Sequence, residues 1–279
     1  MSIRLASVVL TAGVLAGTLH AEAPRFQFQK GETLTYHLLQ NTKVVETVAD
    51  EKTNKPVESE SSTKVDLVRK WKVVGLDEKG VATLEMSIAS MRWERKAGAE
   101  EDVFDSSKPD DLNKKEMAKH VGPVLAVVRI DPYGRVVEVK ESKVGPANRF
   151  ATELPFKLVL PAAEPKPGDA WERTYTIQLD PPLGTGEKYP ATQKFTCQEP
   201  KSGLLAVGLT TEIKELPEQS ADQIPLLPLL PQGTLYFHAA SGRYYAARLK
   251  TERELKNHQG EGSTYKFTST YVEDLVSEK

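Results

Sequence analysis

Cysteine is almost absent from this sequence, which has one, Cys197, in 279 residues. A single cysteine excludes an intramolecular disulfide and a metal site built from cysteines alone, and we interpret Cys197 as a small buried hydrophobe. The net charge is also small, at −2, because Lys plus Arg total 37 and Asp plus Glu total 39. The chain lacks the basic excess of a general nucleic-acid or anionic-membrane binder, so we expect no nucleic-acid partner.

Motifs that carry known chemistry are missing as well. The sequence has no G-x-S-x-G elbow, no phosphate-binding glycine loop and no H-x-H or H-E-x-x-H spacing. The acidic stretch 100–111 lacks the EF-hand spacing and carries lysines among its acids, so calcium has little support. We therefore predict no catalytic residue, no metal and no cofactor. The scattered histidines after the N-terminal segment are His37, His120, His238 and His258.

Residues 1–23 form an apolar segment that is typical of a secretory signal peptide. No charged residue separates Arg4 from Leu19, and Ala21 and Ala23 form an A-x-A pattern. The apolar run is shorter than the roughly 20 residues of a membrane span, and no later run is long and apolar enough. We expect cleavage after Ala21 or Ala23. The product should be a soluble periplasmic or extracellular protein, without a lipid anchor because no cysteine lies near the cut.

The remaining body, residues 24–279, alternates apolar and polar residues with the period of a β-strand. Strands with one apolar face indicate an antiparallel sheet, because buried parallel strands are apolar throughout. The alternation is clearest in residues 65–73, 82–88, 171–179, 205–213 and 265–271.

Turn sequences separate several of these strands. Asp77–Gly80, Asp131–Gly134 and Ala239–Gly242 each end in a glycine that can adopt the left-handed conformation of a hairpin turn. Helical patterns are scarce and short, at residues 109–120 and 144–154. The sequence thus predicts an all-β fold, an antiparallel curved sheet or open barrel with two or three short helices.

Two stretches of the body resemble each other in order. Lys30–Tyr36 and Pro167–Tyr175 each contain a glycine, an acidic residue and then an aromatic strand residue. They would open two similar β-units, 24–142 and 167–279, joined by the proline-rich connector 143–166. The alternative is a single β-rich body without internal duplication.

The segment Ile224–Pro231 reads IPLLPLLP and is the least usual in the chain. Prolines at every third position argue against a helix or a central strand, so we expect an extended or polyproline-like backbone. Its leucines would form an adhesive patch if they were exposed. Three interpretations stay open: a segment that closes the core, a lid over an apolar cavity, and a docking site for a partner.

Three short motifs resemble those of a known family. Lys30–Tyr36, Pro167–Trp171 and Gly233–Phe237 match K-G-[DE]-x-L-x-Y, P-G-D-x-W and G-x-[LIV]-x-F. With the signal peptide, this layout resembles exported bacterial proteins of unknown function, prominent in planctomycetes, and the resemblance implies no activity. More distantly, the layout is similar to periplasmic lipoprotein carriers, whose curved sheets wrap around an acyl chain.

We therefore expect an exported, non-enzymatic protein that binds an apolar small molecule or lipid-linked ligand in a curved sheet. One alternative is an envelope or extracellular structural or interaction protein with a fully packed core and an envelope protein as its partner. Another is an enzyme with a dispersed site, where His37 or His238 meets carboxylates. The candidates for lining a pocket are Trp71, Trp171, Tyr175, Leu226, Leu227, Leu229 and Leu230.

Overall fold

The computed structural model describes residues 23–50, 52–108, 110, 114–115 and 119–278. They form twelve strands, two short α-helices and one 3₁₀-helix. The elements are β1 (Thr33–Ala49), β2 (Pro56–Leu76), β3 (Ala82–Ala97), β4 (Glu100–Asp105), β5 (Val124–Ile130), β6 (Val136–Ser142), α2 (Arg149–Thr152), β7 (Ala170–Leu179), β8 (Glu187–Cys197), β9 (Leu205–Ile213), α3 (Ser220–Gln223), η1 (Ile224–Leu229), β10 (Gln232–His238), β11 (Arg243–Lys256) and β12 (Thr264–Glu278).

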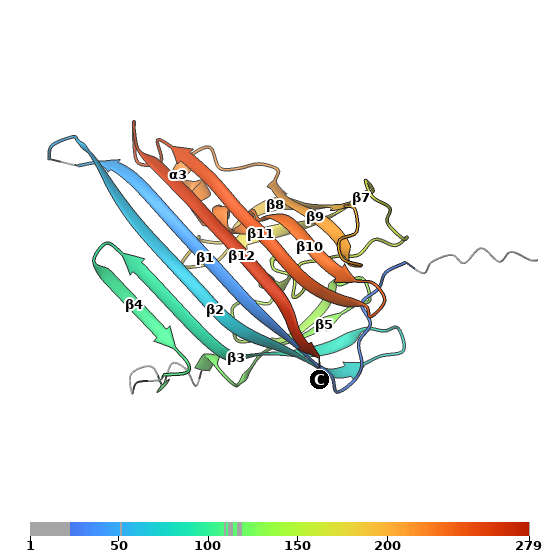
Figure 1. The fold of residues 1–279 in the computed structure, drawn as a ribbon. Coiled ribbons are helices and arrows are strands. Elements are labelled where there is room, and N and C mark those ends of the chain that lie inside the picture. Colours follow the sequence, from blue (N-terminus) through green and yellow to red (C-terminus); the bar gives the residue numbers. More distant parts are fainter. Residues whose placement is uncertain (1–22, 51, 109, 111–113, 116–118, 279) are drawn as a thin grey trace, which may run out of the picture.

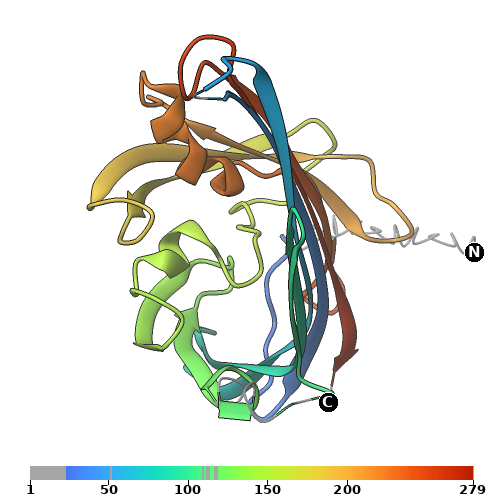
Figure 2. The same ribbon diagram turned by 90° about the vertical axis from the view of Figure 1, so that its left-hand side faces the viewer.

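All strands belong to one antiparallel sheet. Its order is β6-β5-β3-β2-β1-β12-β11-β10-β9-β8-β7, and β4 pairs with β3 beside this path. The sheet is strongly curved (Figure 2), and within the described residues its edge strands β6 and β7 do not pair with each other. The predicted all-β fold with a curved antiparallel sheet and few short helices is confirmed.

The chain passes through the sheet in two meanders that meet at its middle. Strands β1 to β6 lead outward from the centre, and β7 to β12 lead back to it. The two halves join where β1 pairs with β12, from Leu34 opposite Glu278 to Thr47 opposite Thr264 (Figure 1). These halves coincide with the two expected units, 24–142 and 167–279, whose origin by duplication stays a prediction.

The glycine-acid openings of the two halves form the same turn. Gly31 and Gly168 both have a φ of +94°, where a side chain would be strained. Their N–H groups donate to the carbonyls of Val73 and Cys197, at 2.8 and 2.9 Å. Both acceptor residues donate back to the carbonyl of the acidic residue that follows the glycine, at 2.9 and 2.8 Å. The same pattern of hydrogen bonds explains why the same residue pair stands at both places.

Buried residues alternate with less buried ones along strands such as β3, β8 and β10, as the alternation predicted. Ala82, Leu84 and Met86 are buried on β3, and Phe195 and Cys197 are buried on β8. Burial also raises the pKa of the Cys197 thiol, which favours its uncharged form. The interpretation of this cysteine as a small buried hydrophobe is confirmed.

The three expected hairpin turns are present between β2 and β3, β5 and β6, and β10 and β11. In each turn, the N–H of the closing glycine donates to the backbone carbonyl of the first turn residue. The distances are 3.0 Å for Gly80, 2.9 Å for Gly134 and 3.3 Å for Gly242. The expected helix at 144–154 is shorter and is α2, whereas much of 109–120 lies outside the described residues. In the part of the chain that is described, no helix is both long enough and apolar enough to span a membrane.

The prediction of an extended Ile224–Pro231 segment is wrong, because most of it is the 3₁₀-helix η1. A 3₁₀-helix has φ between about −50° and −70°, which the proline ring favours. Pro225 lies in the first turn of η1, where a backbone N–H has no helical partner to lose. The tight helix turns Leu226 and Leu227 into the interior, where both are buried.

The connector 143–166 supplies the centre of the core. Phe156 is 2% exposed, and its ring lies between 5.5 and 6.0 Å from five other aromatic rings, measured between centroids. Aromatic residues from both halves and from the N-terminal segment therefore meet on one connector side chain. They are Phe26, Phe28, Tyr36, Trp71 and Tyr244.

The segment before β1 links the two halves at one end of the sheet. The N–H of Phe26 donates to a carbonyl of the β5–β6 turn at 2.8 Å, and the N–H of Gln27 donates to one of the β10–β11 turn at 3.1 Å. Gly134 packs beneath this link with a φ of +87°. A Cβ at this position would lie 2.4 Å from the carbonyl oxygen of Leu158 and 2.6 Å from the Phe26 ring.

We predict that Gly134→Ala lowers the free energy of unfolding by about 2 kcal/mol more than Gly168→Ala. Both glycines have similar left-handed φ values, but a Cβ on Gly168 meets no atom within 4 Å. The difference thus isolates the contact with Phe26 and the connector. Urea unfolding of both variants measures it, and equal losses would contradict the described contact.

Candidate functional site

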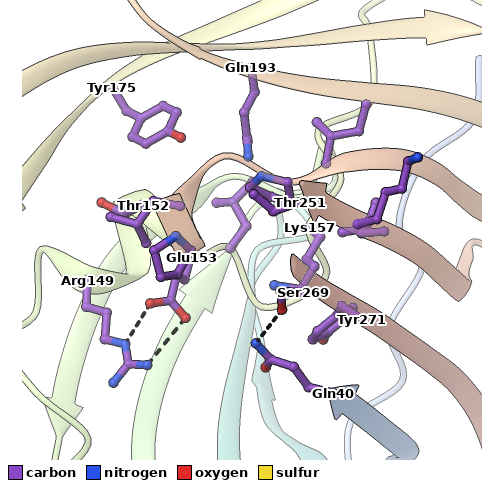
Figure 3. A pocket seen from close by; sticks show the side chains of 17 residues that line it. Gln40, Arg149, Thr152, Glu153, Lys157, Tyr175, Gln193, Thr251, Ser269 and Tyr271 are labelled. Carbon is purple, nitrogen blue, oxygen red and sulfur yellow. Dashed lines mark hydrogen bonds and ion pairs between the residues drawn. The ribbon is translucent and has the colours of Figure 1, made fainter. Parts of the chain in front are cut away.

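A cavity of about 290 Å³ lies on the concave face of the sheet. Its walls come from the connector around α2, from the end of η1 and from strands of both halves (Figure 3). Ligand pockets commonly measure about 300–1,000 Å³, so this cavity has space for one small or single-chain ligand. Its apolar lining consists of Leu154, Leu209, Pro228, Leu229, Pro231 and Leu249, beside the rings of Tyr175 and Tyr271.

The charged lining of the cavity is mostly cationic. Arg149, Lys157 and Lys250 line it, and Glu153 is the one carboxylate among the described lining residues. Arg149 donates to both oxygens of Glu153, at 3.1 and 3.4 Å. Lys250 is exposed and lies 3.8 Å from Glu252. The single carboxylate of the cavity is therefore already neutralised by an arginine.

Lys157 occupies an unusual position in the cavity wall. Its φ of +53° is in the left-handed region, which lysine rarely adopts. Its side chain is half-buried, and Nζ lies 4.5 Å from the centroid of the Tyr271 ring. Burial lowers the pKa of the amine, while the charges of Glu153 and Glu273 act in the opposite direction. Figure 3 shows Lys157 on the same side of the cavity as Gln40, Ser269 and Tyr271.

A buried ion pair lies beside this wall on the concave face. Arg69 donates to the carboxylate of Glu273, which is 1% exposed. The hydroxyl of Tyr244 donates to the same carboxylate at 3.1 Å, and Arg69 donates to the hydroxyl of Tyr271 at 3.3 Å. Burial and the charge of Glu273 raise the pKa of both tyrosines, so both hydroxyls stay protonated. Burial opposes the charge of Arg69, but Glu273 more than compensates and raises its pKa.

A half-buried arginine, Arg173, holds the opposite wall in place. Arg173 on β7 donates to the carbonyls of Ala151 and Thr152, at 2.6 and 3.0 Å, and to Oε1 of Gln193 at 2.7 Å. Its guanidinium carbon Cζ also lies 4.2 Å from the centroid of the Tyr175 ring. Burial lowers its pKa to about 10. These contacts fix α2 against β7 and β8, and so set the width of the cavity.

Two of the seven residues expected to line a pocket do so. Tyr175 and Leu229 are in the cavity wall, although the cavity also needs the connector, which the sequence did not single out. Leu226 lies behind it in a small cluster of buried apolar residues. Leu227 and Leu230 are buried as well.

The two expected tryptophans lie elsewhere in the core. Trp71 is 1% exposed and contacts the Phe156 ring, with 5.8 Å between centroids. Trp171 stacks on Phe195 at 5.8 Å, and its Nε1 donates to the carbonyl of Val159 at 2.6 Å. Neither tryptophan is among the residues that line the cavity.

Lys157 is the residue that sequence reasoning missed. It is the single charged residue in the apolar run 154–160, LPFKLVL. A lone charge in such a run is a signal, because a segment that enters the core seldom carries an unpaired lysine. Gln40, Gln193 and Ser269 carried no comparable signal, since polar residues are common on strands.

Three histidines take part in local contacts away from the cavity lining. Nε2 of His37 lies 2.8 Å from Asp66, between β1 and β2. Nδ1 of His238 lies 2.6 Å from the hydroxyl of Ser241. His258 is buried and its Nε2 lies 2.7 Å from Glu46. None of the four histidines contributes a side chain to the cavity wall described above.

Comparisons with known proteins assign no family, since no family model and no curated protein matches the chain. A structure solved for lipid–protein interactions in lipovitellin aligns with 91% of this chain, at 12% identity and a TM-score of 0.47, and this chain spans 26% of it. DynF, from the dynemicin biosynthesis pathway of Micromonospora chersina, aligns with 96% of this chain and 92% of its own, at 12% identity and a TM-score of 0.16. The Salmonella type III secretion secretin InvG aligns with 88% of this chain and 59% of its own, at 10% identity and a TM-score of 0.14. Similarities this distant do not bear on ligand or activity.

We predict that Glu273→Gln lowers the free energy of unfolding by about 3 kcal/mol, because it leaves the charge of Arg69 buried without a counter-charge. The control is Glu212→Gln, which removes an exposed partner of Lys194 at 2.8 Å. That loss should stay below about 1 kcal/mol. Thermal and urea unfolding measure both variants, and a Glu273 effect no larger than the control would contradict a buried pair.

Proposed function

We propose that the chain is an exported, non-enzymatic protein that binds an apolar or lipid-linked ligand on the concave face of its sheet. The observation that supports this most is the cavity of about 290 Å³ between the connector and the sheet. The connector, η1 and strands of the second half contribute apolar side chains to it, and the first half contributes Gln40. Export rests on the sequence of residues 1–23, of which 1–22 lie outside the described residues.

The position of the cavity also favours a ligand. Phe156 and its aromatic neighbours fill the concave face at one end, where the core is tightly packed. The cavity lies next to this packed core, where the connector residues between α2 and Lys157 form part of its wall. An apolar wall without a partner loses dispersion contacts, which an acyl chain or another apolar group would restore. A structural protein with a fully packed core has no such need for space at this place.

The mature chain purified from an exporting host should carry its ligand. Organic extraction and mass spectrometry, with native mass spectrometry beside them, should find a stoichiometric apolar molecule. Leu229→Asp places a charge in the cavity wall and should reduce the bound fraction at least about tenfold, since a buried unpaired charge is strongly unfavourable. Leu229 is only partly buried, so the fold should tolerate the change.

The matched control is Leu183→Asp, because Leu183 is 62% exposed and lies outside the cavity. This variant should retain the ligand at the level of the unchanged chain. A clean ligand-free mass, together with no uptake of acyl chains on titration, would overturn the proposal. The search would then move to protein partners in the cell envelope.

A further inference from the structure

Lys157 occupies a position where a lysine adds little to the stability of the fold. A left-handed residue in a tight connector is usually glycine or asparagine, because a Cβ is strained there by about 1–3 kcal/mol. The amine is also half-buried in the wall of an apolar cavity, which disfavours its charge. The contact with the Tyr271 ring offsets part of this cost. A purely structural role would be served better by a smaller neutral residue.

The negative charges around Lys157 are already engaged with other cations. Glu153 accepts two hydrogen bonds from Arg149. Glu273 is bound by Arg69 and by the hydroxyl of Tyr244. Arg173 adds a further cation behind the opposite wall, and its acceptors there are neutral carbonyl and amide oxygens. The cavity therefore has a surplus of positive charge that its own carboxylates do not balance.

We propose that the cavity selects single-chain amphiphiles with an anionic head group, which Lys157 binds through a charge-assisted hydrogen bond. The shared chemistry is an oxyanion on an apolar chain, either a carboxylate or a phosphate. This inference rests on the proposed function and names its ligand class. The chain of the ligand would lie against Leu154, Leu209, Leu229 and Leu249.

Neighbouring groups and the size of the cavity agree with this ligand class. Gln40 and Ser269 lie on the same side as Lys157 and offer an amide and a hydroxyl to a second oxygen of the head group (Figure 3). Ser269 already exchanges hydrogen bonds with Gln40 at 3.4 Å and with Thr42 at 3.0 Å, so its hydroxyl is held in place. A cavity of about 290 Å³ has space for one chain rather than for the two of a diacyl lipid.

Binding should depend on pH in a defined direction. Burial lowers the pKa of Lys157 below its ordinary value of 10.5, and the charges that face the amine are those of Glu153, Glu273, Arg69 and Arg149. Laurate stays ionised above about pH 5, because carboxyl groups titrate near 4. Its affinity should therefore be constant near neutral pH and fall as the pH rises through the lowered pKa. Lauryl alcohol, which has no charge, should show no such fall.

The direct test compares three ligands with the same chain: laurate, lauryl phosphate and lauryl alcohol. Isothermal titration calorimetry on the purified protein should show tighter binding of at least one anion than of the alcohol. Lys157→Met should weaken that anion about tenfold and leave the alcohol unchanged, since one charge-assisted hydrogen bond is lost. Lys157→Arg should restore most of the preference. The comparison of the affinities for laurate and lauryl phosphate distinguishes a carboxylate ligand from a phosphate ligand.

The control is Lys266→Met, which removes one positive charge from an exposed position of β12 outside the cavity. It should change no affinity, and the unfolding midpoint of each variant reports that it is folded. Equal affinities for the anions and the alcohol, with no effect of Lys157→Met, would contradict the proposal of an anionic head group. The proposal of an apolar ligand would still hold. If none of the three ligands binds, the proposed function itself fails.

Discussion

The fold depends on covering the inner face of a sheet that does not close. The edge strands β6 and β7 stay apart, so the strands alone cannot enclose the apolar residues on the concave face. The connector between the two halves supplies the missing layer. Its Phe156 contacts aromatic rings from both halves, and the segment around Phe26 links the turns at one end. The hydrophobic effect thus holds together two meanders whose only shared strand pair, among the described residues, is β1 with β12.

The same arrangement creates the cavity. The connector first forms α2, which Arg173 holds against β7 and β8, and then fills the concave face around Phe156. Because the connector follows this path, it does not fill the space between α2, η1 and the central strands, and this space is the cavity. Because the walls come from segments far apart in the chain, small shifts of the connector change the shape of the cavity. A cavity of this kind is a property of the connector as much as of the sheet.

Charged side chains on the concave face reduce stability, so their presence there calls for an explanation other than packing. Apolar residues of similar volume often stabilise a fold as well as a buried ion pair does, yet Arg69 and Glu273 lie at the centre of this sheet. Their pairing engages the carboxylate that could otherwise neutralise Lys157. A face built only for packing would need none of these three groups. A face that receives a charged ligand needs a free cation beside an apolar wall.

The strands and hairpin turns could be predicted because their signals are local. Period-two alternation, as in Leu84 and Met86, and turn glycines such as Gly134 need no knowledge of distant contacts. Local rules failed for the Leu/Pro segment, where proline suits a tight 3₁₀-helix as well as an extended chain. The site could not be predicted from the sequence for another reason. Lys157, Tyr175 and Ser269 come together only because the connector crosses the curved sheet. The sequence by itself determined the strands and their buried faces, and only tertiary structure decided which residues share a cavity, because that depends on the path of the connector.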